Sequence, residues 1–131
     1  MKGVAFGGQT TEIDEIDKYF EIGIDAVNII RMTSFLKELT LFERLITRLK
    51  YTFLKRPRVF EYSKVIKFFS GKEDANENVY PSVFPNWDHS PRSGREGLVF
   101  NNSNPKLFDS HLKAVVSSVS NKPADKKIIF L

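Results

Sequence analysis

The sequence predicts an α/β fold with parallel strands. Short apolar runs alternate with segments of helical spacing, in the order β-α-β-α-α-β-α-β. The first strand, helix and strand fit within about 30 residues, which is the size of a βαβ unit. A four-stranded parallel sheet of this kind can fold alone. It can equally form about half of a (β/α)8 barrel, which typically needs about 250 residues.

The first half of the chain is expected to contain two strands and three helices. Residues 4–6 and 25–30 are apolar runs that predict strands. A helix lies between them, with Thr10 or Thr11 as its cap and Gly23 at its end. A long helix is expected from Thr33 or Ser34 to the break at residues 56–57, followed by a shorter helix over residues 60–69. The apolar positions of the long helix recur at helical spacing: Phe35, Leu36, Leu39, Phe42, Leu45, Ile46, Leu49 and Phe53.

The second half is expected to contain two strands and one helix. Residues 71–78 are polar and predict a loop, residues 80–84 a strand, and residues 94–104 another loop. Residues 105–119 predict a helix, because Pro105 suits its first position and Asn104 its cap. Residues 127–131 predict the last strand. The whole chain, residues 1–131, is expected to be one domain.

Composition excludes several classes of protein. The chain has no Cys, which rules out disulfides, thiolate metal sites and Cys nucleophiles. No apolar stretch approaches the roughly 20 residues of a membrane span. The N-terminal residues are too few and too rich in Gly for a signal peptide, so we expect a cytoplasmic protein. His89 and His111 lack metal-ligand spacing, and we expect no metal and no cofactor. His111 lies on an apolar helix stripe and is expected to be partly buried and hydrogen-bonded.

The net charge of +4 is unevenly distributed. Residues 12–25 are mostly acidic. The stretch from Arg44 to Lys72 is basic, and could attract phosphate, nucleic acid or an anionic membrane surface. A solvated helix face is the more usual outcome. The cations of this stretch are Arg44, Arg48, Lys50, Lys55, Arg56, Arg58, Lys64, Lys67 and Lys72, against Glu61.

Residues 87–92 are the strongest candidate for a binding site. They follow a predicted strand, and binding groups are often carried by loops on a rigid scaffold. Trp87 could stack on a sugar ring, Asp88 could accept from hydroxyl groups, and Arg92 could bind a carboxylate or phosphate. His89 could act as an acid or a base. The alternative is a structural turn, in which Asp88 caps backbone amides, Trp87 packs and Arg92 pairs with Asp88.

The stretch Phe84-Pro-Asn-Trp-Asp-His-Ser-Pro-Arg92 resembles the WbsX-type glycosyltransferases, also described as glycoside hydrolase family 99-like domains. Members carry a Pro-x-Trp-Asp-Asn-x-x-Arg-like stretch, and here His89 replaces the Asn. Residues 22–27, 103–108 and 123–131 are similar to other parts of the family, although only residues 84–92 are specific.

The resemblance implies a (β/α)8-type barrel and a sugar or nucleotide-sugar ligand at Trp87, Asp88, His89 and Arg92. In the family, the strand similar to residues 128–131 runs into a Trp-Asn-Glu-Trp-x-Glu-Gly motif that carries the implied catalytic carboxylates. We therefore expect the chain to be a truncated, partial barrel without catalytic residues. It would be an inactive fragment of a transferase-like or hydrolase-like domain of polysaccharide or cell-surface glycan biosynthesis.

Two other interpretations remain open. The chain could be a small non-catalytic α/β module that binds an anionic partner through the basic face from Arg44 to Lys72, including by contact with a membrane surface. A half-barrel could also self-associate through its exposed sheet edges. Nucleic acid is not expected as a partner.

Overall fold

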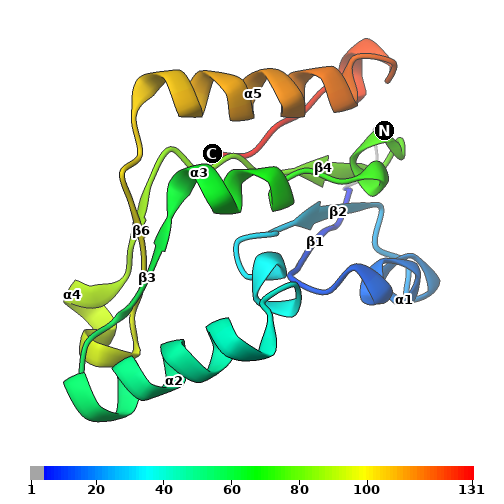
Figure 1. The fold of residues 1–131 in the computed structure, drawn as a ribbon. Coiled ribbons are helices and arrows are strands. Elements are labelled where there is room, and N and C mark those ends of the chain that lie inside the picture. The colour runs from blue at the N-terminus through cyan, green and yellow to red at the C-terminus, as the bar shows by residue number, and fades with distance from the viewer. Residues whose placement is uncertain (1–4) are drawn as a thin grey trace.

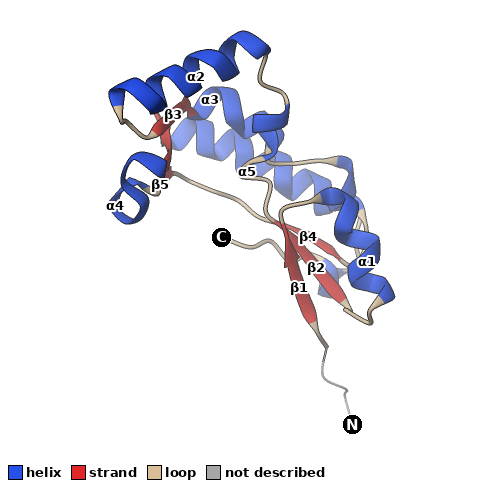
Figure 2. Cartoon of the chain, turned by 90° about the horizontal axis from the view of Figure 1, so that it is seen from below, coloured by secondary structure: helices blue, strands red, loops and turns tan. Residues whose placement is uncertain are grey.

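Two small sheets, each with its own apolar core, organise residues 5–131, which are the residues described by the computed structural model. Figure 1 shows the path of the chain through both sheets. Figure 2 shows the sheets at opposite ends of the molecule, with helix α1 beside the first and helices α2 and α4 beside the second.

The first sheet is parallel, as the sequence predicts. Strands β1 (Gly7–Thr10), β2 (Ala26–Ile29) and β4 (Val79–Pro81) lie side by side in that order. One parallel bridge between Ser82 and Phe130 extends the sheet beyond β4. Helix α1 (Ile16–Glu21) covers one face and buries Ile16 against Val27, Ile29 and Val79.

The second sheet was not expected. Strand β3 (Arg58–Glu61) pairs in parallel with β6 (Leu98–Asn101), and β5 (Trp87–Asp88) pairs antiparallel with β6. Its core is largely aromatic, with edge-on ring contacts, and includes helix α3 (Tyr62–Val65). The buried members of this core are Phe35, Tyr62, Val65, Phe69, Leu98 and Phe100.

Two longer helices begin at side-chain caps. Asn104 accepts a hydrogen bond from the Leu107 amide at 3.0 Å, which starts α5 (Pro105–Val119) at the predicted residue. Thr40 and Glu43 form a capping box that starts α2 (Leu41–Leu54). Lys55 ends α2 in the left-handed region, with φ of 49°. No residue of α2 is buried.

Several predicted elements were wrong. The order β-α-β-α-α-β-α-β omits β3, β5 and β6, and β5–β6 breaks the all-parallel pattern. The long helix is interrupted, because a 3₁₀ turn at Ser34–Lys37 precedes the Thr40 cap. The helix expected over residues 60–69 begins only at Tyr62, because β3 takes the preceding residues. Residues 127–131 form one bridge and no full strand.

The first helix and strand also differ from expectation. Strand β1 begins at Gly7 and not at residues 4–6; Val4 lies outside the described residues. Neither Thr10 nor Thr11 caps the helix. A 3₁₀ turn at Ile13–Glu15 precedes α1. Glu12 is the N-cap residue of this turn, but its side chain forms no capping hydrogen bond. Gly23 follows the helix with φ of 89°, as the sequence predicts for a C-terminal glycine.

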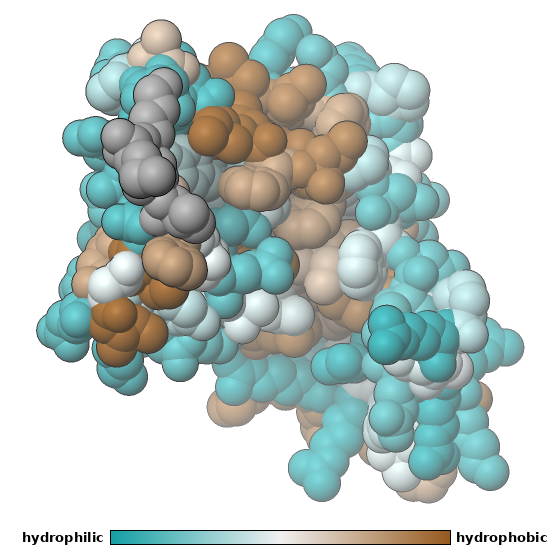
Figure 3. All heavy atoms as spheres, turned by 180° about the vertical axis from the view of Figure 1, so that it is seen from behind, coloured by the Kyte–Doolittle hydropathy of each residue, from teal (hydrophilic) through white to brown (hydrophobic). Residues whose placement is uncertain are grey.

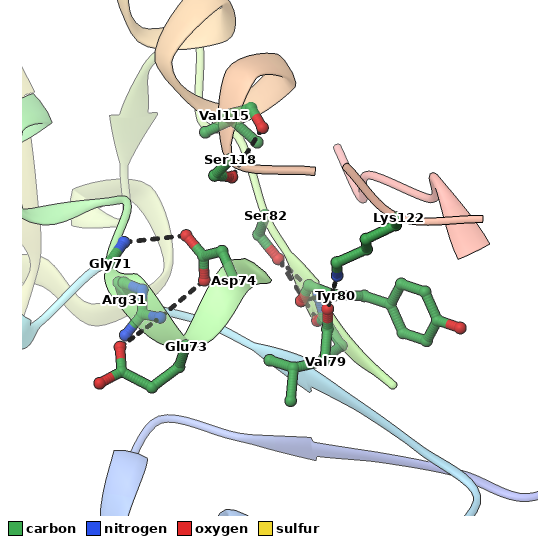
Figure 4. Close-up of polar contacts among 11 residues, drawn as sticks. Arg31, Gly71, Glu73, Asp74, Val79, Tyr80, Ser82, Val115, Ser118 and Lys122 are labelled. Atoms are coloured by element: carbon green, nitrogen blue, oxygen red, sulfur yellow. Dashed lines mark hydrogen bonds and ion pairs between the residues drawn. The ribbon is translucent and has the colours of Figure 1, made fainter. Parts of the chain in front are cut away.

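A buried ion pair orders the polar segment predicted to be a loop. Residues Lys72–Ala75 form a 3₁₀ turn, η4, whose Asp74 is 0 % exposed. Arg31 lies just beyond β2, is 3 % exposed and donates to Asp74 at 2.6 Å. The other Asp74 oxygen accepts from the Gly71 amide at 2.9 Å, and Glu73 accepts from Arg31 at 3.2 Å (Figure 4).

Further buried polar contacts hold β4 in place. The Lys122 ammonium donates to the Val79 carbonyl and lies 5.2 Å from the centre of the Tyr80 ring (Figure 4). Burial lowers the pKa of Lys122, while the charge of Asp74 acts in the opposite direction. On β2, the Asn28 amide donates to the Tyr80 carbonyl and to the Ser82 hydroxyl, both at 2.9 Å.

The C-terminal segment leaves apolar side chains exposed. Ile128, Phe130 and Leu131 are all exposed, and the Phe130 ring centre lies 6.5 Å from that of Tyr80. Figure 3 shows apolar side chains gathered on the face turned away from the viewer in Figure 1. No helix among the described residues is long and apolar enough to cross a membrane.

His111 on α5 is more deeply buried than predicted. It packs against the rings of Phe69 and Phe108, at 5.5 and 6.5 Å between centres. Neither ring nitrogen has a hydrogen-bond partner within residues 5–131, so the expected hydrogen bond is absent. Burial lowers the pKa of His111 below its usual value of 6.5, which keeps the ring neutral.

Breaking the Arg31–Asp74 pair should strongly destabilise the fold. We expect Asp74→Ala to cost about 3–5 kcal/mol of unfolding free energy, because Arg31 would be left charged in the interior. The double variant Arg31→Met/Asp74→Leu should recover much of that loss. Urea denaturation measures the unfolding free energy of each variant. The control is Asp109→Ala, which removes the exposed ion-pair partner of Lys113. An Asp74→Ala variant as stable as Asp109→Ala would contradict this account.

Acid should destabilise the protein through His111. The unfolded chain takes up a proton at His111 as the pH falls below about 6.5, whereas the folded chain resists it because its pKa is lowered, so stability is lost in that direction. His111→Leu should flatten the loss between about pH 7 and 5.5, measured by urea denaturation at each pH. His89→Gln, which replaces the other His of the chain, should show the same loss of stability as the wild type. An unchanged slope in His111→Leu would show that burial of His111 is not its cause.

Candidate functional site

Pairing of β5 with β6 positions the first two residues of the candidate site. Trp87 lies opposite Phe100 and Asp88 opposite Val99. Because successive side chains of a strand point to opposite faces, Trp87 turns toward the aromatic core and Asp88 toward solvent. Trp87 is half-buried and meets Phe84 edge-on at 6.4 Å between ring centres. The strand thus holds an aromatic ring on one face of the sheet edge and a carboxylate on the other.

His89 links the strand to the short helix α4 (Ser90–Ser93). Its amide donates to the Leu98 carbonyl at 3.0 Å, and its own carbonyl accepts from the Arg92 and Ser93 amides. Its Nδ1 lies 3.1 Å from the Ser93 hydroxyl, and its ring stacks on Trp87 at 5.9 Å with 26° between planes. The imidazole therefore supports the position of the Trp87 ring.

Asp88 is an ionised hydrogen-bond acceptor. Its carboxylate accepts from the Ser90 hydroxyl at 2.5 Å and from the Ser90 amide at 2.8 Å. Both hydrogen bonds lower the pKa of Asp88, and the bond from the Ser90 hydroxyl has the larger effect. Asp88 is exposed, so its remaining lone pairs can accept hydrogen bonds from a ligand.

The alternative prediction, that residues 87–92 form only a structural turn, is confirmed in part. Trp87 does pack, and Asp88 does bond to a backbone amide. However, Arg92 forms no ion pair within the described part of the chain, and Asp88 bonds to Ser90 in its place. Arg92 is exposed. The loop therefore presents a guanidinium group and a carboxylate beside a half-buried aromatic ring.

A basic cleft of about 830 Å³ lies between α2, the Ser34–Lys37 turn, β3 and the turn η5 (Gly94–Glu96). We call it the basic cleft; its cations are Lys37, Arg44, Arg48 and Arg58. Tyr51 also lines it and donates to Glu96 at 3.4 Å, and Arg95 lies 5.8 Å from the Tyr51 ring centre. Of the basic stretch predicted from sequence, Lys64 and Lys67 line a different cleft.

Sequence reasoning missed Lys37 and Glu96 as part of this cleft. Lys37 lies at the cleft because its carbonyl accepts from the Arg44 guanidinium at 2.8 Å. Glu96 lies there because Arg58 donates through its amide to the Gly97 carbonyl at 3.0 Å, where β3 and β6 begin to pair. That pairing joins segments far apart in the chain and has no local signal. No group of three His, Asp or Glu side chains within residues 5–131 is arranged to hold a metal ion.

Comparison with known proteins gives one result. Residues 1–131 match the family model described as Glycosyltransferase WbsX. No curated protein and no solved structure matches the chain significantly.

Removing the Ser90 hydroxyl should raise the pKa of Asp88. Ser90→Ala deletes the stronger of the two bonds that favour the charged carboxylate, while the amide bond remains. The measurement is an NMR titration of the Asp88 carboxyl carbon. Ser93→Ala, which removes a hydroxyl bonded to His89, is the matched control and should leave the Asp88 pKa unchanged. Equal values for wild type and Ser90→Ala would mean that Ser90 does not hold Asp88 in its ionised form.

Proposed function

The chain belongs to the WbsX glycosyltransferase family, and on that premise we propose that residues 87–92 are the sugar-binding surface of a glycan-biosynthesis domain. The family supports a role related to glycan biosynthesis and sugar-like ligands. The observation that carries the proposal is that one sheet-edge strand, β5, fixes both the half-buried Trp87 ring and the exposed, ionised Asp88 carboxylate. Aromatic rings offer a rigid apolar face, and carboxylates accept hydrogen bonds from hydroxyl groups, which together suit a polar ring-shaped ligand.

Each residue has a distinct part in this proposal. Trp87 stacks on the ligand ring. The β5–β6 pairing and the His89 contact already fix the position of the Trp87 side chain, so binding costs little side-chain entropy. Asp88 accepts from ligand hydroxyls, since its lowered pKa keeps it ionised. Arg92 binds an anionic group of the ligand, such as a carboxylate or phosphate. His89 positions the Trp87 ring.

Binding without turnover is the expected behaviour of residues 87–92. Glycosyl chemistry uses two carboxyl groups, one of which donates a proton. Residues 87–92 contain one carboxylate, and its lowered pKa makes it a poor proton donor near neutral pH. We therefore expect this chain, assayed alone, to bind sugar with little or no transfer or hydrolysis.

The parallel sheet fits an arc of a (β/α)8-type barrel. Its strands β1, β2 and β4 follow chain order, and the parallel bridge from Ser82 to Phe130 adds the next segment on the same side. Consecutive parallel neighbours with helices in the connections are the pattern of such a barrel. The second sheet lies outside this pattern: β3 belongs to the connection between β2 and β4, and β5 and β6 belong to the connection between β4 and the C-terminal segment.

The basic cleft supports a second candidate function, a site for an anionic partner. Four cations line about 830 Å³ of space with Glu96 as the one acidic side chain among its lining residues. A phosphate-bearing ligand could bind there without touching Trp87. The two candidates respond differently to salt, because binding by clustered cations weakens as salt screens them, while stacking on Trp87 depends little on salt.

Trp87 provides a direct test, because it is the only Trp of the chain. Titration with sugars and nucleotide sugars should change its fluorescence, and the affinity should vary little with salt. Asp88→Asn should weaken binding about 10-fold, since hydrogen bonds to a charged acceptor are stronger than those to a neutral amide. Isothermal titration calorimetry measures the affinity, with Asp109→Asn on α5 as the matched control for an exposed Asp.

Two outcomes would contradict the proposal. Ligand binding that leaves Trp87 fluorescence unchanged would place the ligand elsewhere. Binding that falls steeply with salt and is lost in Arg48→Ala, but retained in Asp88→Asn, would favour the basic cleft.

A further inference from the structure

Helix α2 turns an apolar row toward solvent. Leu41, Leu45, Leu49 and Phe53 are spaced four residues apart and so lie along one side of the helix. They are 85 %, 54 %, 45 % and 75 % exposed. Phe42 beside them is also exposed. An amphipathic helix normally buries such a row against its own protein, so these residues require another apolar environment.

The opposite side of α2 faces the protein and is largely polar. Four side chains of α2 line the basic cleft: Thr47 and Tyr51 on the side away from the row, and Arg44 and Arg48 at the boundary between that side and the row. Thr47 and Tyr51 are only half-buried, and Tyr51 bonds to Glu96. Ile46, which is also half-buried, lines the neighbouring cleft with Phe60 and Phe68. The helix therefore faces the protein through one aliphatic and several polar side chains. Its apolar row is left free within the described structure.

Cations border the apolar row. Five cations lie in or directly after α2, against Glu43 as the single acidic residue: Arg44, Arg48, Lys50, Lys55 and Arg56. All five are exposed. Long basic side chains can lie along an apolar surface while their charged ends reach anionic groups. An apolar row with basic borders is the arrangement of helices that lie in a membrane interface.

We propose that α2 docks on the surface of an anionic lipid bilayer, with the Leu41–Leu45–Leu49–Phe53 row among the acyl chains. The cations beside the row would contact lipid phosphates, which attract Lys and Arg near the surface. At about 1.5 Å per residue, the 14 residues of α2 span roughly 21 Å, and they would lie parallel to the bilayer. This proposal does not depend on sugar binding at residues 87–92.

Charge favours a bilayer over a second copy of the chain. Two α2 helices packed row against row would bring two sets of basic borders together, and like charges facing each other are unfavourable. An anionic bilayer meets the same surface with the opposite charge. Charge complementarity therefore selects the lipid surface as the occupant.

Vesicle flotation of the full chain tests the proposal. The protein should float with vesicles of phosphatidylcholine mixed with phosphatidylglycerol and much less with phosphatidylcholine alone, and salt should weaken the binding. Leu45→Gln/Leu49→Gln should lower the partition coefficient at least about 10-fold, because burial of each Leu is lost. Leu54→Gln is the matched control: Leu54 is exposed but turned about 100° from Phe53, and the change should have little effect.

The variants should remain folded, because none of the substituted residues is buried; circular dichroism melting checks this. The proposal is overturned if the wild type does not float with phosphatidylglycerol vesicles, or if Leu45→Gln/Leu49→Gln floats as well as the wild type. It is also overturned if the wild type elutes as a dimer that the double variant converts to a monomer, without vesicle binding. That last result would assign the row to a second copy of the chain.

Discussion

The constraint on which the rest of the fold depends is that Arg31 and Asp74, which are both buried, must be paired with each other. Arg31 follows the central strand of the parallel sheet, and Asp74 lies in the turn before β4, so the pair fixes the chain that enters β4. Taking both charges out of water is costly, and either charge left alone in the interior would be costlier still. Gly71 and Glu73 complete the hydrogen bonding (Figure 4). A segment of polar composition thus forms a defined turn with one fully buried carboxylate.

The candidate site is a consequence of this ordered path. From β4 the chain passes through Phe84, whose carbonyl accepts from the buried Tyr62 hydroxyl at 2.6 Å, and reaches Trp87. Strand β5 then pairs with β6, which sets the Trp87 ring on the aromatic core and directs Asp88 outward. The site residues gain their geometry from two sheets at once. This is how a short loop without a metal ligand set can present a fixed aromatic and charged surface.

The sequence predicts the local features well and the long-range pairing poorly. The Asn104 cap, the Pro105 start of α5 and the Gly23 turn are all encoded within a few residues. The β3–β6 pair depends on contacts between distant segments. The apolar run Leu98–Phe100 is too short to predict a strand or its partner. The burial of Arg31 and Asp74 also has no local signature, since charged residues are usually exposed. The apolar stripe of α5 predicts that His111 is partly buried, but not that its ring nitrogens lack hydrogen-bond partners within the described residues. The helical spacing of α2 predicts its apolar side but not that this side faces solvent.

The central claim is that residues 87–92 bind sugar on a preformed surface. The most direct measurement is ¹H–¹⁵N NMR shift mapping of the chain during titration with a nucleotide sugar. The Trp87 indole N–H and the backbone amides of residues 87–92 are expected to shift together, with little change elsewhere in the second sheet. Shifts confined to residues around Arg44, Arg48 and Arg58, or no shifts at all, would contradict it.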